Sequence, residues 1–156
     1  METMTMRTKI LKLGSLFLAG ALASLGPAAH ADNINTSGTL CQNFNASQAL
    51  DIDYLATGVR NVNAAPRPVI CAVPRSPLQP AATAAQFFVD GVNAAGTTTT
   101  CTLFIYTFGG VVTQSSTFTL PGFVSLPVIG TFDYASALCT LPGNPGTVLF
   151  GVTSVQ

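Results

Sequence analysis

Two aspartates, Asp51 and Asp53, are the residues of this chain whose type and spacing could do chemistry most directly. Side chains two residues apart lie on the same face of a β-strand, so the two carboxylates would be neighbours. Such a pair can bind a divalent cation, or its repulsion can raise one pKa and supply the general acid of a glycoside hydrolase. The glycine-containing calcium-loop pattern is absent here. The simpler interpretation is a solvated face on which Arg60 or Arg75 neutralises the pair.

The N-terminus has the layout of a secretory signal peptide. Basic residues precede an uncharged apolar run over residues 13–25, and the small-residue triplet Ala29-His30-Ala31 follows it. The run is well short of the roughly 20 residues that a transmembrane helix needs, so we expect cleavage after Ala31 rather than a retained anchor. Residues 1–31 are therefore predicted to be the signal peptide. Residues 32–156 are predicted to form one domain with no stable membrane span.

Cleavage would leave a chain that is almost uncharged, with three arginines, five aspartates and no lysine, glutamate or histidine. No basic patch is present in this sequence, so nucleic acid and anionic membrane surfaces are not expected as partners. An activated serine or cysteine needs a basic partner such as histidine or lysine. We therefore expect a protein that is not an enzyme and that uses no metal or other cofactor.

The four cysteines are the second set of residues with possible chemistry. Zinc sites use close ligand pairs such as C-x-x-C, whereas these cysteines are at least 30 residues apart. An even number of cysteines in a small exported chain predicts two disulfides formed outside the cytosol, although four cysteines allow three pairings. Cys101 and Cys139 lie inside the strongest strand signals, and Cys41 and Cys71 border irregular or edge segments. We therefore predict the pairs Cys41–Cys71 and Cys101–Cys139.

The element that must position these residues is a strand over residues 97–108, where β-branched and aromatic residues run without a breaker. Turn signals on both sides predict that it is the middle strand of two consecutive hairpins. Outside the leader, turn signals recur about every 8 to 12 residues and no segment has helical apolar spacing. The other predicted strands lie at residues 50–63, 69–73 (an edge), 84–92, 111–120, 123–129, 131–141 and 147–155, and residues 32–48 are predicted to be irregular or to lie at an edge.

This pattern predicts an all-β fold, a small two-layer antiparallel β-sandwich of the Ig-like or jelly-roll-like kind with two disulfides. A closed barrel is the alternative architecture. Several of the predicted strands are short and flanked by proline, which is a way of protecting open sheet edges. Closure would have removed that need, so an open sandwich is favoured.

The central strand is apolar on both faces. Leu103 and Ile105 share the face of Cys101, and Phe104, Tyr106 and Phe108 occupy the opposite face. Burial under core and loops on both sides is the structural interpretation. In the functional alternative, Phe104, Tyr106 and Phe108 form an exposed patch that marks a partner site. The absence of tryptophan weakens a lectin interpretation but leaves it open.

Five short segments of the chain resemble a group of small exported proteobacterial proteins that have no assigned activity. The segments are residues 58–62 (GVRNV), 69–75 (VICAVPR), 88–90 (FVD), 101–103 (CTL) and 134–142 (YASALCTLP). The resemblance implies a disulfide-bonded, all-β bacterial protein, and it carries over no catalytic residue.

We therefore predict an exported, non-enzymatic binding or structural module, secreted or periplasmic or attached to the cell surface. Its partner would be another protein or a cell-surface polymer. An adhesin-like or pilin-like subunit is the first specific version, because such subunits are disulfide-bonded β-sandwiches that complete one another by strand addition. The alternative is a small carbohydrate-active hydrolase that uses Asp51 with Asp53, or Asp90 with Asp133. Carboxylates that converge in a cleft would favour the hydrolase, and scattered ones the module.

Overall fold

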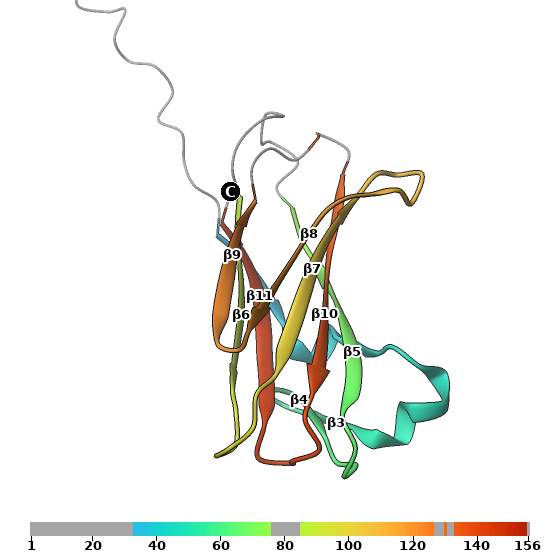
Figure 1. Cartoon of the computed structure of the whole chain (residues 1–156), viewed down its shortest axis with the longest axis vertical. Coiled ribbons are helices and arrows are strands. Elements are labelled where there is room, and N and C mark those ends of the chain that lie inside the picture. Colours follow the sequence, from blue (N-terminus) through green and yellow to red (C-terminus); the bar gives the residue numbers. More distant parts are fainter. Residues whose placement is uncertain (1–32, 76–84, 127–129, 131–132, 156) are drawn as a thin grey trace, which may run out of the picture. The chain divides into compact units, whose positions relative to one another are not determined.

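The computed structural model describes residues 33–75, 85–126, 130 and 133–155. Within these ranges, two antiparallel sheets pack face to face, which confirms the predicted two-layer β-sandwich (Figure 1). No helix in these ranges is long and apolar enough to cross a membrane. The predicted signal peptide lies outside the described residues.

The six-stranded sheet is built around the last strand, β11. Its order is β3 (Ile52–Leu55), β4 (Gly58–Asn61), β11 (Val148–Val155), β6 (Ala85–Val92) and β9 (Gly122–Leu126), and β1 (Asn33–Ser37) also pairs with β11. β4 and β1 share one side of β11 in succession: Val59 pairs with Leu149, and Ser37 pairs with Gly151. The strand signal predicted over residues 50–63 is divided in the structure between two paired strands, β3 and β4.

The five-stranded sheet contains the predicted central strand. Its order is β2 (Gln42–Asn43), β5 (Arg67–Val73), β10 (Tyr134–Leu141), β7 (Thr100–Tyr106) and β8 (Val112–Thr119). The hairpin of β7 with the following strand is confirmed. The predicted hairpin with the preceding strand is wrong, because β6 belongs to the other sheet. The Asn93 side chain accepts hydrogen bonds from Thr99 and donates one to the carbonyl oxygen of Leu120. These bonds fix the segment in which the chain passes from β6 in one sheet to β7 in the other.

One further prediction is confirmed in part, and another is corrected. The segment over residues 32–48, expected to be irregular or at an edge, contributes β1, β2, the 3₁₀ helix η1 (Gly38–Leu40) and the first residues of a second one, η2 (Ala46–Asp51). The edge part of that prediction is confirmed within the described residues, because β2 ends the five-stranded order and β1 pairs with β11 alone. Thr153 of β11 donates a hydrogen bond to Asn35 of β1 across 118 residues of sequence. β5 was expected at an edge, but the two-residue strand β2 pairs outside it.

The core lies between the inner faces of the two sheets. Cys101, Leu103 and Ile105 of β7 are fully buried there, as the alternation predicted. Phe87 and Val89 of β6 oppose them from the other sheet with less than 2% exposure, so the strand periodicity correctly identified the inward positions.

Both predicted disulfides are present. Cys41 bonds Cys71 with their Cα atoms 4.1 Å apart, and Cys101 bonds Cys139 with a Cα separation of 4.0 Å. Cys101 and Cys139 are direct cross-strand partners on β7 and β10, and Cys41 immediately precedes β2, the partner of β5. Both bonds therefore join neighbouring strands on the buried face of the five-stranded sheet. No cysteine is free, which indicates a non-reducing, extracytoplasmic environment.

Candidate functional site

The carboxylates of Asp51 and Asp53 each bind a different arginine. Asp53 lies opposite Arg60 in the β3–β4 hairpin and accepts hydrogen bonds from its Nε and Nη2 at 2.9 and 2.7 Å. Asp51, the last residue of η2, accepts a bond from Arg67 Nε at 2.5 Å and one from Asn63 Nδ2 at 2.9 Å. The expectation that Arg60 neutralises the pair is correct for Asp53. Asp51 is neutralised by Arg67 of β5 and not by Arg75.

These contacts decide the charge state of Asp51. The hydrogen bond from Arg67, followed by that from Asn63, holds the pKa of Asp51 below its ordinary value, and its partial burial opposes this only in part. A general acid at neutral pH needs the opposite, a raised pKa. Asp51 is therefore an anion at neutral pH, and its hydrogen bond to Arg67 ties the end of η2 to β5.

The other two aspartates considered for catalysis are not brought together. Asp90 lies on the outer face of β6 in the six-stranded sheet. Asp133 precedes β10 of the five-stranded sheet and accepts a hydrogen bond from the backbone N–H of Gly130 at 2.9 Å. Arg75 donates to the carbonyl oxygens of both Gly130 and Asp133 at 2.8 Å. Within the described ranges, no group of three or more acidic, cysteine or histidine side chains is arranged to hold a metal.

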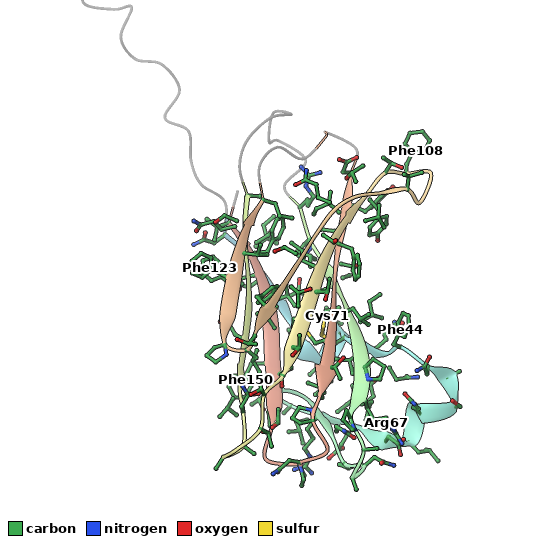
Figure 2. The ribbon with its side chains drawn as sticks, viewed as in Figure 1. Phe44, Arg67, Cys71, Phe108, Phe123 and Phe150 are labelled. Atoms are coloured by element: carbon green, nitrogen blue, oxygen red, sulfur yellow. A yellow bond between two sulfur atoms is a disulfide. The ribbon has the colours of Figure 1, made fainter. Side chains whose placement is uncertain are left out.

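The predicted partner patch is divided between a strand and a turn. Phe104 and Tyr106 are half-buried on the outer face of β7, and the ring of Tyr106 stacks on Tyr134 of β10 with centroids 5.7 Å apart. Phe108 lies beyond the end of β7, in the turn to β8, and is 85% exposed (Figure 2). Phe104 and Tyr106 thus share one surface, and Phe108 stands at its end.

Register extends this surface over the neighbouring strands. Leu138 of β10 lies between Thr102 of β7 and Ile70 of β5, and both apolar side chains are half-buried on the outer face. We call the set Ile70, Phe104, Tyr106, Tyr134 and Leu138 the outer patch. Ile70, Tyr134 and Leu138 were not among the residues predicted for the patch, because their inclusion depends on the pairing of β10 with β7 and β5.

The outward-facing positions around the outer patch carry no charged side chain. Those of β5, β10 and β7 are occupied by Pro68, Ile70, Ala72, Tyr134, Ser136, Leu138, Thr140, Thr100, Thr102, Phe104 and Tyr106. On β8 the positions opposite β7 are Ser115, Thr117 and Thr119. An outer sheet face without charge is unusual for a surface that meets only water, where charged residues are normally abundant.

Comparisons with known proteins give no relative from which a role could be carried over. No protein-family model matches the chain, and no curated protein matches it. The resemblance to small exported proteobacterial proteins therefore stays a prediction, and function is inferred from the surfaces that the fold exposes.

Proposed function

We propose that this protein is an exported, non-enzymatic binding module that docks an uncharged, apolar surface of another protein onto the outer patch. The observation that carries the proposal is the charge-free outer face of the five-stranded sheet, with its aromatic and aliphatic centre. Centres of protein interfaces are depleted of charge and enriched in aromatic side chains. Contiguous apolar patches on the surface of a small domain mark such interfaces.

Two observations support the extracytoplasmic and non-catalytic parts of the proposal. Both disulfides are consistent with folding in an oxidising compartment, as expected for a secreted or periplasmic protein. The aspartates that a hydrolase would use are each held by an arginine or lie on different sheets. This arrangement favours the module over the hydrolase alternative.

The edge strand β8 supports a pilin-like version of the module. β8 ends the order of the five-stranded sheet, so one side of it faces no other strand in the described part of the chain. Its eight residues, Val112–Thr119, include neither proline nor a charged residue, two of the usual means of protecting an open edge. The bulge of β8 lies near its start, at Thr113, and leaves residues 114–119 in regular register with β7. A strand of another subunit could therefore add to β8 and extend the sheet beside the outer patch.

Site-specific photocrosslinking in cells that export the protein tests the docking face. A p-benzoylphenylalanine residue replaces Phe104 in the outer patch or, as the matched control, the exposed Phe123 on the six-stranded sheet. We expect an adduct with one protein from position 104, its loss when Leu138→Arg is added, and no such adduct from position 123. The absence of an adduct from position 104, or an adduct that persists in Leu138→Arg, would contradict the proposal.

A further inference from the structure

An open hollow of about 670 Å³ lies on the six-stranded sheet. Its lining comes from β1, from the turn between β3 and β4, from β6 and from β11, and includes Asn35, Thr57, Asp90, Phe150, Gly151 and Thr153. The outer patch belongs to the other sheet. A ligand of this hollow would thus be independent of the protein docking proposed above.

A β-bulge in β11 provides the aromatic wall of the hollow. Leu149 pairs with Gly91 and Gly151 pairs with Asp90, so Phe150 is an extra residue without a partner on β6. Bulges redirect side chains, and Phe150 is 43% exposed although both Leu149 and Val152 are buried. Figure 2 labels Phe150 on this sheet, at a position distinct from that of Phe123 on β9.

Gly151 allows β1 to lie close to β11 at the rim of the hollow. A Cβ atom there would lie 2.5 Å from the backbone oxygen of Thr36, closer than Cβ contacts in real structures. Only glycine therefore allows β1 to pair at this distance, with Ser37 opposite Gly151 and Asn35 opposite Thr153. The polar side chains of β1 thereby reach the same hollow as Phe150.

A row of polar side chains from three strands lines the same hollow as Phe150. Thr153 Oγ1 of β11 donates to Asn35 Oδ1 of β1 at 2.7 Å and lies 3.5 Å from Asp90 Oδ2 of β6. Asp90 is exposed and forms no ion pair with the described arginines, so its carboxylate oxygens are accessible as acceptors. The row combines a carboxylate, an amide and a hydroxyl, which together accept and donate several hydrogen bonds.

The chemistry of the hollow selects the class of ligand. The carboxylate of Asp90 is its single charge, so an anionic ligand would be repelled. An organic ammonium could form a cation–π contact with Phe150 and an ion pair with Asp90, but it offers no acceptor for a hydrogen bond from the side-chain amide of Asn35. A sugar ring offers an apolar C–H face for the aromatic side chain and several hydroxyls for the polar row. We propose that the hollow binds a neutral saccharide ring, as at the end of an extracellular or cell-surface glycan.

Amide chemical-shift titration of the ¹⁵N-labelled mature protein tests this site. The probes are the methyl glycosides of glucose, galactose, mannose, xylose and N-acetylglucosamine, each added separately. We expect at least one to give saturable shifts confined to the residues that line the hollow, namely Asp90 and residues 35–37, 56–57 and 150–153. Phe150→Ala should abolish the response, and Asp90→Asn should weaken the affinity roughly tenfold, as expected when a hydrogen bond to a charged acceptor is replaced by a weaker one.

Phe123→Ala is the matched control, since Phe123 is another exposed phenylalanine of the same sheet and does not line the hollow. It should leave the titration unchanged. Should Phe150→Ala fail to fold, Phe150→Leu removes the ring while keeping an apolar side chain, and its amide spectrum reports folding directly. The proposal is overturned by the absence of saturable shifts with all five glycosides, by a response that Phe150→Leu leaves intact, or by tetramethylammonium shifting the same residues more strongly than any glycoside.

Discussion

Replacing Cys101 and Cys139 together by alanine should destabilise the domain more than the same replacement of Cys41 and Cys71. In the chain-entropy model, a disulfide stabilises a protein by restricting its unfolded chain. The two bonds close sequence separations of 30 and 38 residues. Each is therefore worth about 3.5 to 4 kcal/mol, and the two differ by only about 0.2 kcal/mol in this respect. Any larger difference between the variants must come from the folded state.

Burial alone does not separate the two pairs, because all four cysteines are at most 1% exposed. The two pairs differ in how firmly the strands beside them are paired. β7 and β10 are joined through seven residue pairs, so their neighbours cannot collapse into the space left by the sulfurs, at a cost of roughly 1 kcal/mol per sulfur. β2 and β5 are joined through two residue pairs only, so the segment around Cys41 can loosen and regain chain entropy. We therefore expect the free energy of unfolding to fall by about 5 to 6 kcal/mol when Cys101 and Cys139 are replaced, and by about 3 kcal/mol when Cys41 and Cys71 are replaced.

Urea unfolding followed by far-UV circular dichroism measures this difference, with thiol titration to verify that the remaining disulfide is intact. A difference of about 2 kcal/mol corresponds to a shift in the urea midpoint of roughly 1 M between the two variants. Limited proteolysis should also cut residues 38–48 faster in the variant that lacks Cys41 and Cys71. Equal midpoints, or a lower midpoint for that variant, would refute the reasoning and show that β2 unfolds only with the whole domain.

Three further predictions concern an ion pair, a close backbone contact and the leader. The stabilisation that Asp51 gains from Arg67 is fully present above the ordinary carboxyl pKa and is lost as the pH falls through the lowered pKa of Asp51. Asp51→Asn should therefore be less stable than the wild type at neutral pH, and the urea midpoints of the two proteins should converge in acid. A difference in midpoint that stays constant with pH would contradict this. Gly58→Ala should unfold at a much lower urea concentration than Gly96→Ala, because a Cβ atom at position 58 would collide with the backbone oxygen of Leu149. A Cβ atom at position 96 meets nothing within 4 Å, and the positive φ there costs an alanine only about 1 kcal/mol. Similar urea midpoints for the two variants would count against this prediction. N-terminal sequencing of the exported protein should begin at Asp32, and a start at Met1 in a membrane fraction would disprove the cleavage.

Most of the strands, and the pairing of the cysteines, could be predicted from the sequence because they depend on local patterns. Alternation places Leu103 and Ile105 on the face of Cys101, and turn residues end each strand close to where the structure ends it. Cys101 and Cys139 lie within such strands, where direct cross-strand neighbours are within disulfide distance. The position of a residue along its strand and the face that it occupies are both local properties.

The sheet that a strand joins is not a local property. The turn signals at residues 93–96 correctly ended β6, but they could not show that the next strand lies in the other sheet. Polar composition predicted that residues 32–48 were irregular or at an edge, but it could not show which strand they would join. β1 is held by backbone hydrogen bonds to β11, which any residue with a free N–H can form. The arginine that neutralises Asp51 could not be identified for a related reason, since Arg67 comes from β5, a strand of the other sheet.

The hollow on the six-stranded sheet shows how one irregular residue changes which side chains are available for binding. Strict alternation along residues 148–155 would place Phe150 on the same face as Val152, in the core. The bulge of β11 against β6 prevents this. On the opposite side of β11, Gly38 and Gly58 approach the backbone oxygen of Leu149, and Gly151 approaches that of Thr36. A glycine within a strand pattern is the one sequence signal for such a bulge. The bulge therefore exposes the aromatic ring, and Gly151 brings β1 beside it. A substitution such as Gly151→Ala would collide with Thr36 of β1, so it should displace Asn35 and weaken saccharide binding even though Phe150 remains.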